Sequence, residues 1–361
     1  MNPEINDLIE KEEAELAEYD DSSETPPSDI VAFNELRSCA DLKRMHDTNQ
    51  LIIKPDFQRD VVWSNPSQTR FIDSLVKQLP IPSMCLSLDY KTEKRLMIDG
   101  LQRISSIIRF LQDDNWRLST LDDIDTRISG KTAGYIKKNN FDLYSRIENL
   151  TIPVTVLRCD YSKKTHTNYL FTIFHRLNTG GNKLNNQEIR NCIYSGSFNE
   201  LLKAVVKKDV FVNIFSIDKE KSYRFSNEEL ILRVFAFSDD YENYNGKLAK
   251  FLNNYMDDNK QISEDEWKFK EDKMERVLNL FYNNILQGRP LQKLSKATTE
   301  SILVGIYKNV DQLELENSAN LITRYNTLRS DANFSVDSLS EGLSATDKVK
   351  SRIGRAVEIF S

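Results

Sequence analysis

Apolar residues recur at helical spacing between two proline-containing segments of the chain. An asparagine–proline pair at 65–66 is typical of a helix cap, here Asn65, followed by a first-turn proline. Phe71, Leu75 and Leu79 follow at intervals of four residues, which places them on one helix face. The sequence PIP at 80–82 then ends the helix. We therefore predict an amphipathic helix between these two segments.

Alternation of apolar and more polar positions then predicts a pair of strands. Met84, Leu86 and Leu88 stand at every second position, as in a half-buried strand. The sequence KTEK at 91–94 turns the chain back into the apolar run 96–98. We expect a hairpin here, and it leads directly into a glycine and a further helix.

The helix after the hairpin is amphipathic. Ile104, Ile107, Ile108 and Leu111 recur at helical spacing, so one face of it is expected to be buried. A further strand is predicted over 151–157. Because proline cannot donate to a sheet ladder, Pro153 in this strand indicates an edge position or a bulge.

Helices dominate from about residue 165 onward. Ser226 with Glu229 forms a capping-box pattern, and Asn185 with Glu188 forms a looser one. We expect a buried Arg233 to be paired and to hold the two domains together. The basic segment 348–355 is interpreted as a solvated helix end, with contact to DNA as the alternative.

These elements predict an α+β fold, because strands occur only in the first half of the chain. Residues 1–28 are acidic and end in a Ser- and Pro-rich stretch, which favours a disordered arm. We predict an α/β domain over 29–160 and a helical domain over 161–361. No internal repeat is evident in the sequence.

Composition places the protein among ordinary globular chains. Of its 361 residues 39% are hydrophobic and 29% are charged, and no apolar run approaches a membrane span. The start of the chain does not resemble a signal peptide, so we expect a cytoplasmic protein without a membrane partner. The formal net charge of −6 argues against bulk electrostatic binding of DNA, although the locally basic stretches at 163–164 and 203–208 leave a positive face open.

The cysteines and histidines give no metal signature. Cys39, Cys85, Cys159 and Cys192 are single and widely spaced, which argues against a zinc site or a disulfide framework. We expect four buried thiols. The three histidines form no metal-binding helix motif.

The segment 97–106 carries the clearest candidate chemistry. It reads as a strand that passes through Gly100 into a helix, and helix starts present backbone N–H groups and a positive dipole end. Gly100 allows a ligand to approach the backbone, and Arg103 offers paired donors to phosphate oxygens. The alternative is a plain strand-to-helix turn with a solvated arginine.

Four motifs in order resemble one family. PDFQRDVVW at 55–63, LPIP at 79–82, IDGLQR at 98–103 and FHRLNTGGNKLNNQEIRN at 174–191 together resemble the N-terminal domain family of GmrSD-type restriction endonucleases. That family is similar to the nucleotide-binding fold of ParB and sulfiredoxin. The resemblance implies a domain of bacterial defence that binds a nucleoside triphosphate with Mg²⁺. No Walker-type GxxxxGK motif is present.

The resemblance also implies the site. The family's DGQQR motif matches Asp99, Gly100, Gln102 and Arg103, whereas Leu101 departs from it and puts turnover in doubt. Asp99 is the expected metal ligand. The catalytic candidates are Asp99, Gln102, Arg103 and Glu188. The candidates for binding the nucleotide are Gln58, Arg59, Gly100, Arg103, Ser105, Asn178, Gly180, Gly181 and Arg190.

Three functions remain open on this sequence. The first is a subunit that binds a nucleotide, with hydrolysis of the nucleotide as one variant of this function. Occupancy of its site would control binding of DNA or of a separately encoded nuclease. The second is a metal-dependent DNA nuclease that uses Asp99 and Glu188. The third is a non-enzymatic interaction protein that keeps the fold, an interpretation favoured by Leu101 and by the lack of the family's His-Asn-His nuclease domain.

Overall fold

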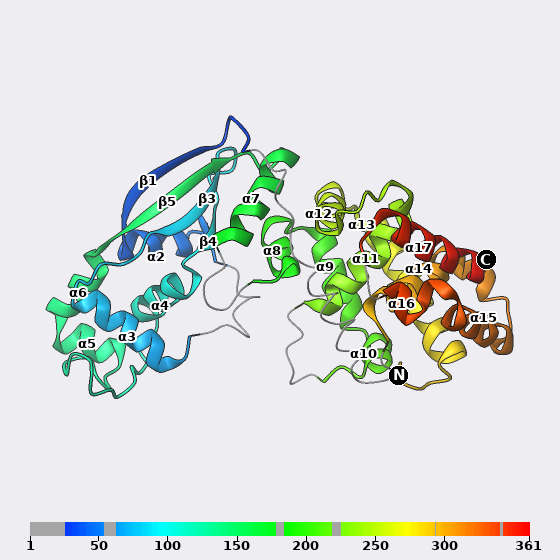
Figure 1. Ribbon diagram of the computed structural model, residues 1–361. Helices are drawn as coiled ribbons and strands as arrows, with labels where there is room; N and C mark the ends of the chain where they lie inside the picture. The colour runs from blue at the N-terminus through cyan, green and yellow to red at the C-terminus, as the bar shows by residue number, and fades with distance from the viewer. Residues whose placement is uncertain (1–25, 54–62, 178–183, 219–224, 293, 340–341) are drawn as a thin grey trace. The chain divides into compact units, whose positions relative to one another are not determined.

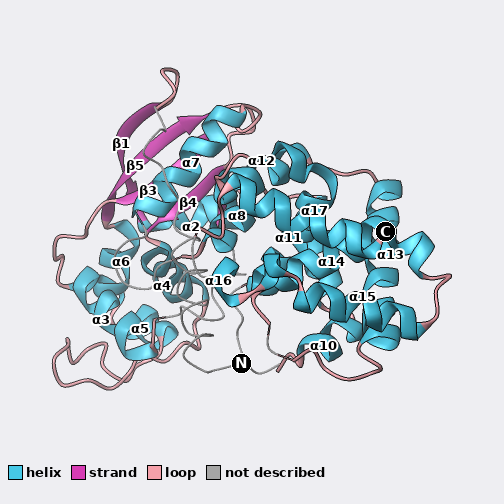
Figure 2. Cartoon of the chain, turned by 45° about the vertical axis from the view of Figure 1, so that its right-hand side comes forward, coloured by secondary structure: helices cyan, strands magenta, loops and turns pink. Residues whose placement is uncertain are grey.

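The computed structural model describes residues 26–53, 63–177, 184–218, 225–292, 294–339 and 342–361. They belong to two compact units, the first ending at Leu184 and the second beginning at Asn185 (Figure 1). All strands of the described residues belong to the first unit, and the second is helical (Figure 2). The predicted α+β class, a sheet with helices followed by a mainly helical region, is therefore confirmed.

The first unit is built on a five-stranded mixed sheet. Its strand order is β1-β5-β3-β4-β2. The β3–β4 and β1–β5 pairs are antiparallel, whereas β5 runs parallel to β3 and β2 parallel to β4. The predicted hairpin is thus confirmed as β3–β4. The strands are β1 (Val31–Ser38), β2 (Leu51–Ile52), β3 (Met84–Asp89), β4 (Arg95–Asp99) and β5 (Thr151–Cys159).

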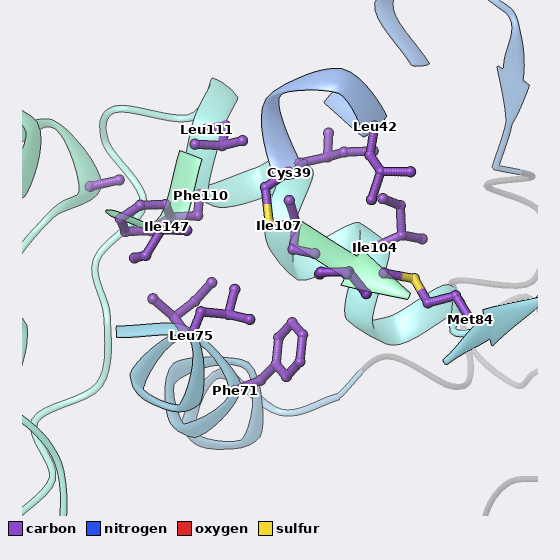
Figure 3. Packing of buried hydrophobic residues seen from close by; sticks show 14 of the residues in the cluster. Cys39, Leu42, Phe71, Leu75, Met84, Ile104, Ile107, Phe110, Leu111 and Ile147 are labelled. Atoms are coloured by element: carbon purple, nitrogen blue, oxygen red, sulfur yellow. The ribbon is translucent and has the colours of Figure 1, made fainter. Parts of the chain in front are cut away.

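Helices pack on this sheet, and those between residues 39 and 149 share one apolar core with it. Side chains of three helices, Cys39 and Leu42 on α2, Leu75 on α3, and Ile104 and Ile107 on α4, face one another in that core (Figure 3). The four apolar positions predicted for the buried face of α4 are indeed buried. The helices are α2 (Cys39–Asp47), α3 (Asn65–Val76), α4 (Leu101–Gln112), α5 (Ala133–Asn139), α6 (Phe141–Asn149) and α7 (Lys164–Leu177).

Helix α7 lies against β4, which assigns it to the first unit. The sequence predicts a domain boundary after residue 160, whereas the compact units divide after Leu184. The helical character of α7 is visible in the sequence, but its packing partner is not. The predicted acidic arm over 1–28 lies outside the described residues except for its last three positions.

Three local predictions for this unit are corrected. All six residues of β3 are buried, so the strand is not half-buried, because it lies at the centre of the sheet between β5 and β4. Pro153 is not in an edge strand: β5 lies between β1 and β3, and its pairing with β3 begins at Val154, after the proline. Helix α3 is capped by Ser64, with Asn65 as its first helical residue.

The second unit is a helical assembly. Its helix α14 packs against both α11 and α17. All four cysteines of the chain are buried thiols, as predicted. Within the described residues, none of the helices combines the length and the apolar character needed to cross a bilayer. The helices are α8 (Asn186–Ile193), α9 (Ser197–Val206), α10 (Asp209–Phe215), α11 (Ser226–Asp240), η2 (Tyr241–Asn243), α12 (Leu248–Asp258), α13 (Glu264–Asn279), η3 (Leu280–Ile285), α14 (Lys296–Leu313), α15 (Ser318–Ser330), η4 (Ala332–Phe334), α16 (Val336–Leu339) and α17 (Thr346–Phe360).

Candidate functional site

The junction between β4 and α4 is built around Gly100. This residue is buried and has φ of 100° and ψ of 13°, a left-handed conformation that residues with a side chain rarely adopt. A Cβ at this position would lie 2.8 Å from Cγ of Met84, on the neighbouring strand β3. Both the backbone angle and the contact therefore require glycine, and they turn the chain from the strand into the helix.

The start of α4 has the features of an anion site. Among the described residues, no side chain caps this helix. The first backbone N–H groups of a helix point away from it and carry the positive end of the helix dipole. An oxyanion beside Gly100 would meet these donors without obstruction by a Cβ.

Arg103 lies on the first turn of α4 and is held by protein acceptors. Its Nη2 donates to Oδ2 of Asp99 at 2.8 Å, and its Nη1 donates to the backbone oxygens of Pro82 and Ser83. The Arg103 side chain is 14% exposed and that of Asp99 is 39% exposed. The guanidinium is thus fixed at the β4–α4 junction, and an incoming anion has to compete with Asp99 for it.

Gln102 and Ser105 lie on the same helix, and both are partly buried. Oε1 of Gln102 accepts a hydrogen bond of 2.9 Å from the backbone N–H of Trp63. Through this bond α4 holds the last residue of the segment that carries the FQR motif. Leu101, the position that departs from the DGQQR pattern, packs partly buried against the core of the unit.

Five predicted site residues lie outside the described residues. They are Gln58, Arg59, Asn178, Gly180 and Gly181. The structure therefore brings together Asp99, Gly100, Gln102, Arg103 and Ser105 at one junction, and the roles of all ten remain predictions.

Glu188 and Arg190 belong to the second unit, on α8. Glu188 is buried and completes a capping box: its Oε2 accepts from the N–H of Asn185 at 2.7 Å, and Oδ1 of Asn185 accepts from its N–H at 2.8 Å. The capping interpretation of this pair is confirmed. The arrangement uses one carboxylate oxygen of Glu188 to hold the helix start.

Arg190 is fully buried in a network of polar side chains. Its guanidinium donates to Asn253, Gln187 and Glu229. Burial lowers the pKa of Arg190, against the opposing effect of Glu229. The bonds to α11 and α12 give Arg190 a structural role within the second unit.

Glu229 does not form the capping box predicted with Ser226. Helix α11 instead follows Phe225, which takes a left-handed conformation, and Glu229 binds Arg190 and Arg233. Burial raises the pKa of Glu229, but the two guanidinium groups outweigh this effect and lower it to about 2. The carboxylate prefers two buried arginines to the backbone N–H of the helix start because a charge pair is stronger than a neutral hydrogen bond.

Sequence reasoning missed the residues that complete this network. Arg233 is buried and paired, as predicted, but its described partners Glu229 and Glu300 both lie in the second unit. Glu300 also binds Arg352, which lies in the basic segment 348–355. That segment is thus neither a solvated end nor free for DNA at this position. In the sequence, the position of Glu300 among the apolar residues of α14 was the one indication of a buried, paired carboxylate.

The described residues provide limited means to hold a metal. No group of three or more His, Cys, Asp or Glu side chains comes together among them. Asp99 is the partly exposed carboxylate at the β4–α4 junction. One or two carboxylates together with phosphate oxygens are a usual ligand set for Mg²⁺, so Asp99 fits that ion in the presence of a nucleotide.

The fold and the junction together define a class. This is an α+β protein in which a left-handed glycine opens a helix, with Asp99, Gln102 and Arg103 around its start. Residues 40–195 match the family model of the GmrSD restriction endonuclease, N-terminal domain, and this part of the chain belongs to that family. No curated protein and no solved structure matches the chain.

Proposed function

We propose that this protein is a component of a restriction system that binds a nucleoside triphosphate at the β4–α4 junction. Membership of the GmrSD N-terminal domain family supports the restriction role. The observation that supports nucleotide binding is the left-handed Gly100 at a helix start that no described side chain caps, beside the Asp99–Arg103 pair. These parts match the donors and the close backbone approach that phosphates need.

Arg103 changes partners in the proposed binding step. Its guanidinium leaves Asp99 for a phosphate oxygen while the backbone oxygens of Pro82 and Ser83 keep it oriented. Asp99 is the side chain that would hold Mg²⁺ beside the phosphates. The ion supplies neutralisation of the phosphate charge.

Occupancy of the site would control a second binding event in this proposal. The ligand links Asp99 and Arg103 to the helix start, and Gln102 on the same turn holds the backbone at Trp63. A shift of α4 would therefore also move the backbone at Trp63. DNA or a separately encoded nuclease is the partner that such a change would admit.

Replacement of Arg103 tests this site. In Arg103→Ala, triphosphate affinity measured by calorimetry with Mg²⁺ is expected to fall at least tenfold, because the phosphate loses a charge-assisted bond of about 1.5–3 kcal/mol. Arg44→Ala on α2 is the matched control, since it also removes one ion pair with a nearby aspartate, Asp41. Unchanged affinity in Arg103→Ala would refute the assignment.

A second candidate function is an interaction protein that keeps the fold without the chemistry. The packing of Leu101 against the core favours it, because this position offers no polar group to a ligand. A panel of nucleotides tested by thermal unfolding separates the two functions, since a ligand of the folded state raises the unfolding temperature. Absence of any shift, with or without Mg²⁺, would support the interaction protein.

A further inference from the structure

The sheet of the first unit ends on one side in a long strand with an open outer edge. Strand β1 forms this margin, and among the described strands it pairs with β5 alone (Figure 1). It has eight residues, whereas β2 at the opposite margin has two. Short strands, lysine, proline and bulges commonly protect sheet edges, and β1 has none of these features. The long edge is therefore suited to pairing with a further strand.

The pairing of β1 with β5 shows which backbone groups face the open edge. The N–H of Cys39, directly after β1, donates to the backbone oxygen of Leu150 at 3.0 Å. Bonded and non-bonded pairs alternate along an antiparallel ladder, so the odd-numbered residues of β1 bond to β5. The residues that point the other way are Ala32, Asn34 and Leu36. Their backbone N–H and C=O groups have no partner among the described residues.

The side chains make this edge apolar and electrically neutral. Val31 is 51% exposed, Phe33 is 39% exposed and Leu36 is 69% exposed. The two charged residues of the strand, Glu35 and Arg37, form an ion pair of 2.7 Å with each other. Exposed apolar residues along a neutral edge favour pairing with a strand of the same kind.

We propose that β1 pairs with β1 of a second copy of this chain, antiparallel and about a two-fold axis at Asn34. This register places Asn34 opposite Asn34 of the second copy, and Leu36 opposite Ala32. All three outward residues of each strand then form bonded pairs. Such a contact is self-complementary, as a two-fold interface between identical chains has to be.

The remaining side chains also fit a second copy of the strand. In this register Glu35 lies opposite Phe33 of the second copy, and Arg37 lies opposite Val31. No like charges therefore face each other directly, an arrangement that would destabilise a strand pair. The pairing is independent of the proposed nucleotide site, because β5 and β3 lie between β1 and β4 in the sheet.

Sedimentation of the full chain measures this association. With rising concentration, the wild-type chain is expected to shift from the mass of one chain to that of two. Leu36→Lys should weaken the association at least tenfold, because it places a charge in an apolar contact that the dimer makes twice. Leu315→Lys is the matched control, since Leu315 is 88% exposed in the second unit and should leave the association unchanged. A wild-type chain that stays monomeric, or an equal effect of both variants, would overturn the proposal; in the first case the edge would be left to a different protein.

A disulfide bond locates the two-fold axis. Asn34→Cys should cross-link two chains under mild oxidation, because bonded pairs place their Cα atoms about 5.5 Å apart, within the range of a disulfide. Ala32→Cys on the same face is the control, since the two copies of this residue lie too far apart along the ladder. The four natural cysteines are buried. Non-reducing electrophoresis that shows no dimer for Asn34→Cys, or as much dimer for Ala32→Cys, would refute the pairing about Asn34.

Discussion

Single residues in this protein owe their identity to different physical requirements. Gly100 is required by its backbone angle and by Met84, whereas Glu229 is required by two buried arginines. The sequence alone indicated the first, since a glycine between a strand and a helix is typical of a turn that needs a left-handed backbone. Local spacing suggested the wrong partner for the second, because it cannot show a contact between helices.

Replacement of Gly100 should cost stability through two separable effects. Gly100→Ala is expected to lower the free energy of unfolding by about 2–3 kcal/mol, because an alanine at positive φ is strained and its Cβ meets Met84. Gly288→Ala is the control, since Gly288 also has positive φ but a Cβ there would meet no atom within 4 Å. It should cost about 1 kcal/mol in chemical denaturation. Equal costs would contradict the role given to Met84.

Glu229 should make the stability of the second unit depend on acid pH. Its pKa of about 2 in the folded protein lies below the ordinary value of 4.5, so the stabilisation is complete above pH 4.5 and is lost as pH falls toward 2. Glu229→Gln should lower the free energy of unfolding at neutral pH by about 3 kcal/mol and by much less near pH 2. The exposed Glu242 offers the control Glu242→Gln. A pH-independent difference would disprove this linkage.

At the scale of elements, periodicity predicted those strands and helices whose burial follows from their own pattern of apolar residues. The β3–β4 hairpin and the buried face of α4 follow from alternation and from helical spacing. The burial of β3 on both faces and the interior place of β5 did not follow, because strand order depends on pairings between distant segments. For the same reason, Glu300 and Arg352 could not be paired from the sequence.

Because Glu188 forms the capping box of α8, substitutions at this position can distinguish a structural role of the side chain from a catalytic role. Glutamine at this third helical position can accept the same bond from the N–H of Asn185, so Glu188→Gln should change the free energy of unfolding by less than about 0.5 kcal/mol. Glu188→Ala should cost about 1 kcal/mol. Any nucleotide hydrolysis or DNA cleavage lost in Glu188→Gln alone would then report carboxylate chemistry. A large loss of stability in Glu188→Gln would show that the charge itself is needed.

For the whole molecule, two compact units imply two cores that form separately. The core cluster that includes Cys39, Phe71 and Val156 belongs entirely to the first unit. The five predicted site residues at the β4–α4 junction lie in that unit, and the buried arginine network lies in the other. The length of the sequence is compatible with more than one domain, but it does not show where the boundary between the two units lies.

The first unit should therefore fold without the second. A fragment of residues 26–184 is expected to show a single cooperative thermal transition, because it contains the sheet, its helices and their common core. Circular dichroism of the fragment and of the full chain provides the comparison. A fragment without a cooperative transition would mean that its core needs residues beyond 184.

The parallel pairing of β3 with β5 has a kinetic consequence. Met84 pairs with Val154, so the centre of the sheet forms only after α4, α5 and α6, which lie between these strands in the chain, have been brought into place. The entropy cost of closing this long loop must be met before the contacts between the two strands can stabilise it. Topologies of this kind therefore fold slowly. During refolding, the helical unit should thus reach its native state first, while β3 still exposes apolar edges that neighbouring molecules can capture.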